Sequence, residues 1–225
     1  MAKTALIVGA TGLVGRELLK MLLKQGNYDK VVAIVRRPLK IADQKLTEIV
    51  TDFDKLDESV IDFHVDDVFS CLGTTIKKAQ SKDVMYRIDV TYPLRVAKLS
   101  RKAGAKKLLF VSAMGANAKS SIFYTRIKGE LEGEVQKLGY DSIAIFRPSL
   151  LLGERAEFRF GEKTAEVMFR ALSFLFVGPL RKVKGIEAKT IALAMYDVAQ
   201  AEEKGIAIYQ NDEIEKIGSL SINNA

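Results

Sequence analysis

Three polar residues in the middle of the chain have the types and the spacing that carbonyl chemistry requires. Tyr124 and Lys128 lie four residues apart in a segment of helical periodicity, so they share one face of the expected helix. Ser112 ends the apolar, strand-length run just before that segment. A tyrosine can give a proton to a carbonyl oxygen whose carbon receives a hydride, and a serine can hydrogen-bond the same oxygen. We therefore predict Tyr124 as general acid/base and Ser112 as the group that orients the carbonyl.

The expected role of Lys128 is electrostatic. A phenol has a pKa near ~10, which must fall by about three units for the group to act as a base near neutral pH. A neighbouring ammonium supplies part of that fall. The alternative is an exposed tyrosine and lysine on a helix surface. The position of the pair favours chemistry, because it follows a strand whose carboxyl end is expected to border a ligand crevice.

A glycine-rich stretch near the start predicts where a cofactor binds. Residues 9–15 read Gly-Ala-Thr-Gly-Leu-Val-Gly, directly after an apolar strand and at the start of a helix. Gly9 permits a tight turn, Gly12 lets the backbone approach a pyrophosphate, and Gly15 lets the helix pack close to the strand. A plain glycine-rich turn is the alternative. The expected contacts to the cofactor come from Gly9, Thr11, Gly12, Leu13, Val14 and Gly15.

The end of the second predicted strand indicates which dinucleotide is preferred. Sites that select NAD place an acidic residue there to accept a hydrogen bond from the ribose 2′-hydroxyl. This chain has Arg36 and Arg37 instead, followed by Pro38. Guanidinium groups can bind a 2′-phosphate, whereas an acid would repel it. The predicted cofactor is therefore NADP(H), and a solvated loop is the alternative for the two arginines.

The elements that position these residues alternate between strands and helices. Nearly continuous apolar strands separated by helices predict an α/β fold, a doubly wound, mostly parallel Rossmann sheet covered on both faces. Pro93 is expected to kink the longest helix. The predicted strands are Thr4–Val8, Val31–Val35, Glu48–Val50, Asp67–Leu72, Lys107–Ser112 and Ser142–Arg147, and the predicted helices are Leu13–Lys24, Ser81–Lys102 and Phe123–Leu138.

The pattern loosens after Pro148. Too few residues follow for a large second domain, so we expect one domain over residues 1–225. Residues 156–204 are expected to form a small C-terminal region that covers the substrate. The elements predicted in this part are helices at Glu162–Phe176 and Ala188–Glu203 and a strand at Ile206–Tyr209, with frayed residues at the end of the chain.

Composition and charge exclude several classes of protein. Of 225 residues, 48% are hydrophobic and 28% are charged, which is typical of a folded globular chain. One cysteine cannot form an intramolecular disulfide, and with one histidine it argues against a zinc site, so no metal is expected. The lone thiol fits a reducing compartment and no signal peptide or membrane span is recognised, so we expect a cytoplasmic protein. The residues behind the net charge of +7 are dispersed, so the expected partner is a small molecule rather than nucleic acid.

The motifs together resemble a known superfamily. The glycine stretch 9–15, Ser112 and the run from Tyr124 to Lys128 are similar to those of short-chain dehydrogenases/reductases. The longer stretches at 111–117, 123–132 and 146–153 resemble its atypical group, which includes the NmrA-like proteins and the Tat-interacting-protein oxidoreductase. The resemblance covers residues 3–155 well and the C-terminal third loosely.

The resemblance implies further site residues. It implies a Rossmann fold, NADP(H) binding and a Ser-Tyr-Lys site in which Lys128 also holds the nicotinamide ribose. Asp89 stands where many members carry an asparagine, which puts the asparagine-anchored proton-relay water of those members in question here. The remaining cofactor contacts that the resemblance implies are Asp52 and Phe53 for the adenine, Cys71, Leu72, Gly73 and Thr74 for the nicotinamide-side ribose, and Pro148 and Leu150.

These features predict an NADP(H)-dependent oxidoreductase acting on a small carbonyl/alcohol pair. One alternative is a cofactor-binding sensor or partner-binding regulatory protein without turnover. The presence of Tyr124 favours an enzyme, because NmrA-like relatives that only sense the cofactor typically lack this tyrosine. Another alternative is a sugar-nucleotide epimerase, but the short C-terminal region argues against it. A homodimer packed through the tyrosine-bearing helix is compatible with the resemblance, and the sequence does not name the substrate.

Overall fold

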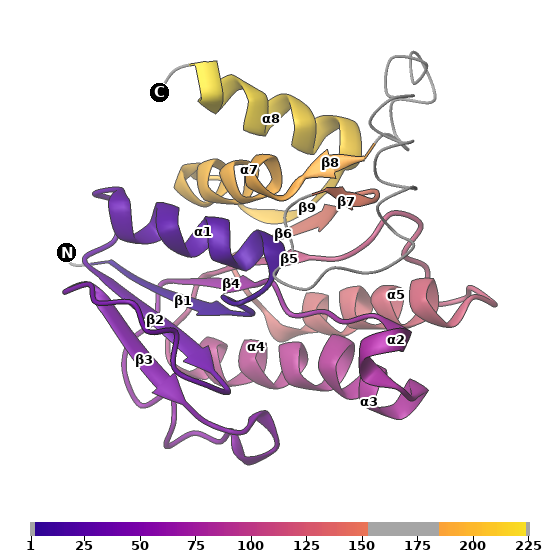
Figure 1. The fold of residues 1–225 in the computed structure, drawn as a ribbon, viewed down its shortest axis with the longest axis horizontal. Helices are drawn as coiled ribbons and strands as arrows, with labels where there is room; N and C mark the ends of the chain where they lie inside the picture. Colours follow the sequence, from indigo (N-terminus) through magenta and orange to yellow (C-terminus); the bar gives the residue numbers. More distant parts are fainter. Residues whose placement is uncertain (1–2, 153–184, 224–225) are drawn as a thin grey trace.

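The computed structural model describes residues 3–152 and 185–223, and its centre is one sheet of seven parallel strands. The order across the sheet is β3-β2-β1-β4-β5-β6-β9 (Figure 1). Chain order reverses between β1 and β4, where Val8 pairs with Ser70. A ligand crevice forms at the carboxyl ends of the strands beside such a reversal. The strands are β1 (Thr4–Val8), β2 (Lys30–Val35), β3 (Leu46–Val50), β4 (Asp67–Ser70), β5 (Lys107–Val111), β6 (Ser142–Arg147) and β9 (Gly205–Gln210).

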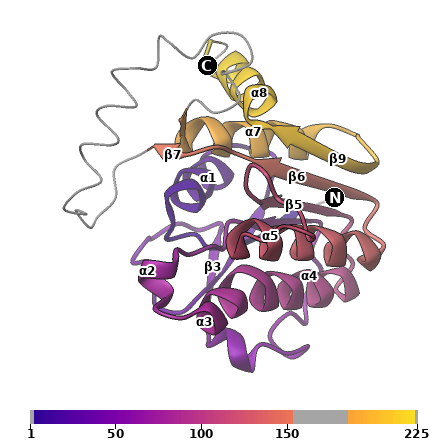
Figure 2. The same ribbon diagram turned by 90° about the vertical axis from the view of Figure 1, so that its right-hand side faces the viewer.

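Helices cover both faces of the sheet, as Figures 1 and 2 show. One face carries α1 (Leu13–Lys24), α7 (Ala188–Gln200) and α8 (Asn211–Asn223). The other carries α4 (Tyr92–Lys102) and α5 (Phe123–Val135). Each face has its own apolar core, and β-strand residues contribute to both. The predicted doubly wound Rossmann arrangement is confirmed.

The sequence pattern explains these layers. In α1, Val14, Leu18 and Leu22 recur four residues apart and are buried on one stripe against the sheet. The strands read as continuous apolar runs, since a parallel sheet covered on both faces buries every side chain. Five of the six residues of β2 are buried. Predicted and observed bounds agree for β1, α1 and β6, and they differ by up to two residues at the ends of β2, β3, β4 and β5.

The predicted long helix Ser81–Lys102 is divided in the structure. It consists of α3 (Lys82–Tyr86), a π-helical turn η2 (Arg87–Thr91) and α4. Pro93 lies in the first turn of α4, and it cannot donate a backbone hydrogen bond back into the helical turn that precedes it. The regular helix is thus interrupted by a π turn directly before the proline, where a kink was predicted. A short helix α2 (Ile76–Ala79) after β4 was not predicted.

The C-terminal part of the chain joins the main body. Two short strands, β7 (Leu151–Leu152) and β8 (Ile186–Glu187), pair in parallel and lead into α7. We predicted residues 156–204 as a substrate-covering region, and this is wrong for α7, because that helix packs on the sheet in the same core as α1. The predicted helix Glu162–Phe176 lies outside the described residues. The frayed end predicted from Ser221 is also wrong up to Asn223, where α8 ends.

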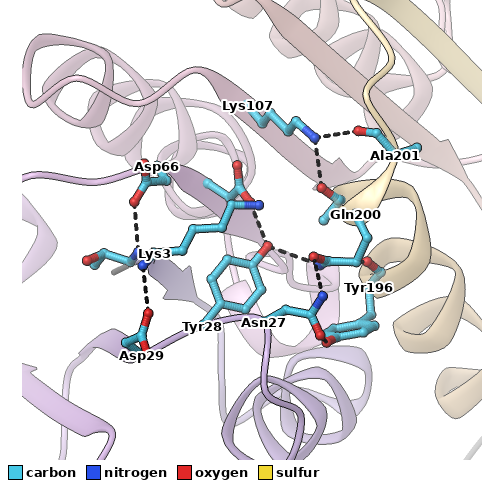
Figure 3. A network of polar contacts seen from close by, with 12 residues as sticks. Lys3, Asn27, Tyr28, Asp29, Asp66, Lys107, Tyr196, Gln200 and Ala201 are labelled. Carbon is cyan, nitrogen blue, oxygen red and sulfur yellow. Dashed lines mark hydrogen bonds and ion pairs between the residues drawn. The ribbon is translucent and has the colours of Figure 1, made fainter. Parts of the chain in front are cut away.

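A polar network at the amino ends of the strands ties α7 to this body (Figure 3). The Lys3 ammonium lies 2.7 Å from the buried Asp67 carboxylate, and the Tyr28 hydroxyl donates to the same carboxylate at 2.6 Å. Gln200 of α7 donates in turn to the Tyr28 hydroxyl oxygen at 3.3 Å. Lys107 donates to two backbone carbonyls at the end of α7. This network lies at the opposite edge of the sheet from the crevice that the strand order predicts.

Candidate active site

A pocket of about 880 Å³ opens at the carboxyl ends of β1, β4 and β5. It therefore lies where the strand order places a crevice. Twelve of the predicted site residues line it: Thr11, Gly12, Leu13, Val14, Cys71, Leu72, Gly73, Thr74, Ser112, Tyr124, Lys128 and Leu150. Seven predicted residues do not line it: Gly9, Gly15, Arg36, Arg37, Asp52, Phe53 and Pro148. The lining residues that we did not predict are Arg16, Thr75, Ile76, Lys78, Lys82, Met85, Val111, Ile122, Phe123, Ser149 and Leu151.

The glycine loop is as compact as its spacing requires. Gly9 has φ of +79°, and a Cβ there would lie 2.5 Å from the backbone of Cys71. A Cβ at Gly15 would lie 2.2 Å from the Gly9 carbonyl oxygen. Gly9 and Gly15 therefore allow close backbone packing within the loop but do not line the pocket, whereas Gly12 lies in the pocket wall.

The amino terminus of α1 is prepared for an anion. Its N-cap is Gly12, which offers no side chain to the free N–H groups, and no acidic residue occupies the first turn. Thr11, Gly12, Leu13 and Val14 line the pocket there. Free amides and the positive end of the helix dipole bind phosphates. These residues fit the pyrophosphate of a dinucleotide.

The residues expected around the adenosine have other partners for their side chains. The Asp52 carboxylate accepts the N–H of Asp54 at 3.0 Å. Phe53 is buried, and its ring stacks on Tyr92 at 5.4 Å between centroids. Arg36 and Arg37 are exposed directly after β2. Their contacts to adenine and to a 2′-phosphate therefore stay predictions.

Tyr124 and Lys128 lie together on α5, with Asp89 as a third partner. The Lys128 side chain is almost fully buried, and its Nζ lies 2.8 Å from Oδ1 of Asp89 and 6.0 Å from the centroid of the Tyr124 ring. The other carboxylate oxygen of Asp89 accepts the backbone N–H of Thr74 at 2.9 Å. Asp89 is fully buried within the π turn η2. It thus connects the lysine with the loop after β4 that lines the pocket.

The electrostatics of this group differ from the prediction. Tyr124 is 38% exposed. Its partial burial is the main cause that raises its pKa, the Asp89 carboxylate raises it further, and the Lys128 ammonium lowers it by less than these two together. Burial disfavours the charged form of Lys128, but the Asp89 carboxylate outweighs burial and the pKa of the ammonium is raised. We predicted that the Lys128 ammonium supplies part of the fall in the pKa of Tyr124 toward neutrality. The ammonium does lower this pKa, but burial and the Asp89 carboxylate raise it by more, so the net shift in the protein alone is upward.

Ser112 has a partner that the sequence analysis missed. Its hydroxyl donates to Oε1 of Glu132 at 2.5 Å, and Arg147 of β6 binds the same carboxylate through Nε at 3.0 Å and Nη2 at 2.5 Å. Ser112 and Glu132 are both buried. A hydroxyl has one hydrogen, so it cannot donate to Glu132 and to a substrate carbonyl at once. The i, i+4 spacing of Lys128 and Glu132 on α5 was the available signal, since such residues share a helix face.

The rest of the pocket wall is largely apolar. Ile76, Ile122 and Leu150 come from three separate segments, and they are 52%, 64% and 48% exposed. Cys71 also lies in the wall, and burial raises the pKa of its thiol to about 12. A thiol with so high a pKa stays neutral, so Cys71 acts as a small apolar side chain in the wall.

The described residues, 3–152 and 185–223, also bear on membrane spans and metal sites. No helix in this part of the chain is long and apolar enough to cross a membrane. It also contains no group of three or more His, Cys, Asp or Glu side chains placed to hold a metal ion.

Comparison with known proteins identifies the family. The NAD dependent epimerase/dehydratase family matches residues 5–173. The chain belongs to this family. Protein HTATIP2 of Rattus norvegicus is 40% identical over 174 residues, which are 76% of this chain and 72% of that protein. The resemblance to atypical, NAD(P)-binding short-chain dehydrogenases/reductases is confirmed.

Two further comparisons concern length and fold. A Candida albicans relative, "Protein FMP52, mitochondrial", is 34% identical over 94% of this chain and 93% of its own. The solved structure of MoeE5 in complex with UDP-glucose and NAD has a TM-score of 0.69, covers 98% of this chain and 82% of its own, and is 18% identical. At that identity the likeness shows the Rossmann-type fold alone.

The relatives correct one prediction. We expected a cytoplasmic protein from the single cysteine and from the lack of a recognised signal. Several fungal relatives are named mitochondrial proteins, so the prediction is contradicted and we withdraw it.

Proposed function

We propose that this protein is an NADP(H)-dependent oxidoreductase that interconverts a small carbonyl compound and its alcohol. The observation that carries the proposal is one pocket that holds both the uncapped amino terminus of α1 and the Tyr124–Lys128 pair. The first feature suits a dinucleotide, and the second suits proton transfer to an oxygen. Family membership supports a nicotinamide cofactor.

Separate residues of the chain would bind the cofactor and transfer the proton. The amides of Leu13 and Val14 in the first turn of α1 would hold the pyrophosphate, whereas the Gly12 N–H already donates to the Gly9 carbonyl at 2.9 Å. The exposed Arg36 would bind the 2′-phosphate of NADP. When bound, the cofactor supplies or takes up the hydride. In the reducing direction the carbonyl carbon gains that hydride and the carbonyl oxygen takes the proton of Tyr124. Solvent then returns a proton to Tyr124, so the reaction consumes one proton for each alcohol formed.

The lining of the pocket supports an apolar substrate. The exposed side chains Ile76, Ile122 and Leu150 offer aliphatic surface beside Tyr124. Burial of that surface against an aliphatic or aromatic carbonyl compound is favourable by about 25 cal/mol per Å². The hydroxyl groups of a nucleotide sugar would gain nothing from these three aliphatic side chains. Apolar aldehydes and ketones therefore rank before nucleotide sugars as substrates.

The test combines a substrate screen with one variant. NADPH oxidation is followed over a panel of aldehydes, ketones and quinones. Conversion of UDP-glucose to another UDP-hexose is followed separately in the presence of oxidised cofactor, because epimerisation consumes no NADPH. On the best substrate, Tyr124→Phe should lower turnover by about 10²–10⁴-fold, because a positioned acid contributes that much. NADPH affinity, measured by calorimetry, should change by only a few-fold, since the phenyl ring remains.

Two outcomes would remove the proposal. A Tyr124→Phe variant within a few-fold of the unaltered protein would show that Tyr124 is not the acid. Stoichiometric NADPH binding without turnover anywhere in the panel would instead support a sensor or partner-binding protein.

A further inference from the structure

Asp89 is a buried charged group in contact with Lys128, and the proposed function does not explain its place in the site. It lies within η2, the π-helical turn between α3 and α4. A π turn adds a residue to a helix and is often found at functional sites. Here the turn carries a carboxylate that is fully buried and reaches Lys128 on α5 at 2.8 Å.

Burying this carboxylate costs several kcal/mol unless its partners compensate, and it has two. Lys128 compensates one oxygen, and the N–H of Thr74 binds the other at 2.9 Å. A Cβ at Gly73 would lie 3.5 Å from Oδ1 of Asp89 and 3.6 Å from Nζ of Lys128, so the pair lies directly under the pocket wall. The carboxylate therefore fixes the ammonium in position and cancels its charge there.

We propose that Asp89 is a positioning residue that holds the Lys128 ammonium and balances its charge, so that Lys128 favours the ionised form of Tyr124 less than a lone ammonium would. This inference rests on the proposed function. The ionisable groups that act on Tyr124 are Lys128 on its own helix and Asp89 from η2. Glu132 also acts on Lys128 from the next turn of α5, but its carboxylate is bound by Arg147.

The charge balance gives the expected behaviour. With Asp89 ionised, the pair carries no net charge, and a phenolate beside it gains little. Without Asp89, the Lys128 ammonium stands alone in a buried place, and a phenolate at Tyr124 becomes its natural counter-ion. Removal of the carboxylate should therefore lower the pKa of Tyr124, which a merely structural role of Asp89 would not do.

The first experiment measures Tyr124 itself, without substrate. The ultraviolet absorbance of tyrosinate is followed against pH in the unaltered protein and in Tyr124→Phe, and the difference isolates one of seven tyrosines. The midpoint in the unaltered protein should lie above pH 10, the usual value for tyrosine. A midpoint clearly below this value would overturn the proposal, and this arm does not require any variant at Asp89 to fold.

The second experiment repeats the difference titration in Asp89→Asn, which keeps the shape of the side chain. We expect the Tyr124 midpoint to fall. The double variant Asp89→Asn with Lys128→Met should reverse that fall, since the unbalanced ammonium causes it. An unchanged or raised midpoint in Asp89→Asn would contradict the proposal.

The matched control is Asp67→Asn. Asp67 is also a buried carboxylate beside a lysine and a tyrosine, but it lies at the amino edge of the sheet (Figure 3). The variant Asp67→Asn should lower the free energy of unfolding and leave the pH midpoint of Tyr124 ionisation unchanged. With a substrate in hand, the pH at which the reduction rate falls on the alkaline side should move down in Asp89→Asn and not in Asp67→Asn. A protein without turnover would contradict the proposed function, and the titration would still decide the role of Asp89.

Discussion

The hydroxyl of Ser112 can serve a substrate only if it leaves Glu132. A hydrogen bond to a buried carboxylate contributes about 1.5–3 kcal/mol, so Ser112→Ala should lower the free energy of unfolding by that order. Its turnover should fall less than that of Tyr124→Phe. Denaturant unfolding and steady-state kinetics measure the two effects. The control is Ser100→Ala, because the buried Ser100 hydroxyl has no hydrogen-bond partner among the described residues.

This variant decides between two roles of the same residue. A turnover loss as large as that of Tyr124→Phe, with stability unchanged, would restore the predicted contact between Ser112 and the carbonyl oxygen. A stability loss with modest kinetic effect would assign Ser112 to the support of Glu132 and Arg147.

The proposed preference for NADP(H) can also be tested at single residues. A charge-assisted hydrogen bond contributes about 1.5–3 kcal/mol, so Arg36 should favour NADPH over NADH by roughly 10–150-fold. Salt should bring the ratio toward the lower end, because Arg36 is exposed. Arg36→Ala should therefore weaken NADPH binding and leave NADH binding nearly unchanged.

Calorimetric titrations with both cofactors at two salt concentrations measure this preference. Arg37→Ala is the matched control, because neighbouring side chains at a strand end point to opposite sides and only one can face the ribose. Equal affinity of the unaltered protein for both cofactors would show that the arginines belong to a solvated loop and do not bind the 2′-phosphate.

At the scale of elements, the start of α1 is the part of the fold most directly committed to a ligand. A Cβ at Gly12 would lie 3.3 Å from the Gly9 carbonyl oxygen, a tight contact that a small adjustment can relieve. A Cβ at Gly15 would lie only 2.2 Å from the same oxygen, so a substitution there would force the backbone to move. Gly12→Val should therefore abolish most NADPH binding and leave a folded protein. Gly133→Ala on α5 is the control, because a Cβ there has no neighbour within 4 Å. Calorimetry should show loss of binding in the first variant only.

Thermal unfolding must accompany that titration. A folded Gly12→Val protein with unaltered affinity would show that the first turn of α1 does not hold the cofactor. Gly133→Ala should gain up to about 1 kcal/mol, because alanine is the better helix former.

The same scale shows what the sequence could predict. β1, α1 and β6 have strong local signals, namely continuous apolar runs or a four-residue apolar repeat beside glycines, and their bounds were predicted. The π turn η2 has no such signal, because it looks like ordinary helix in the sequence. Asp89 and Lys128 are far apart in the chain, and only the packing of η2 on α5 brings them within 2.8 Å. The glycine loop and the Tyr124–Lys128 pair were predictable because each is a local motif. The compensation of the Lys128 charge was not, because it depends on the tertiary contact with Asp89.

At the scale of the whole molecule, the C-terminal segments complete the sheet. β9 adds its seventh strand beside β6, and α8 packs closely on α7, since a Cβ at Gly218 would lie 2.2 Å from the Thr190 carbonyl oxygen. α7 is joined to the first strands through Gln200, Tyr28 and Asp67. Stability of the body therefore depends on buried tyrosine hydroxyls at the edge of the sheet away from the pocket.

This dependence predicts a loss of stability in alkali. Burial, together with the Asp67 carboxylate, raises the pKa of Tyr28 far above its usual value, and burial raises that of Tyr140. In the unfolded chain these phenols ionise near ~10. The stabilisation is therefore complete below about pH 10 and is lost as pH rises above it, by up to ~1.4 kcal/mol per pH unit for each such tyrosine. The melting temperature should be flat near neutral pH and fall steeply beyond pH 10.

Tyr28→Phe tests the assignment of this alkaline loss. The variant should melt lower at neutral pH, because Asp67 loses a hydrogen bond, and its melting temperature should fall less steeply between about pH 9 and 11. Tyr86→Phe is the control, since Tyr86 is 38% exposed and its ionisation is less coupled to folding. The measurement is a series of thermal melts followed by circular dichroism at closely spaced pH values. If the alkaline slope of Tyr28→Phe equals that of the unaltered protein, other groups cause the loss, and the network in Figure 3 does not control stability at high pH.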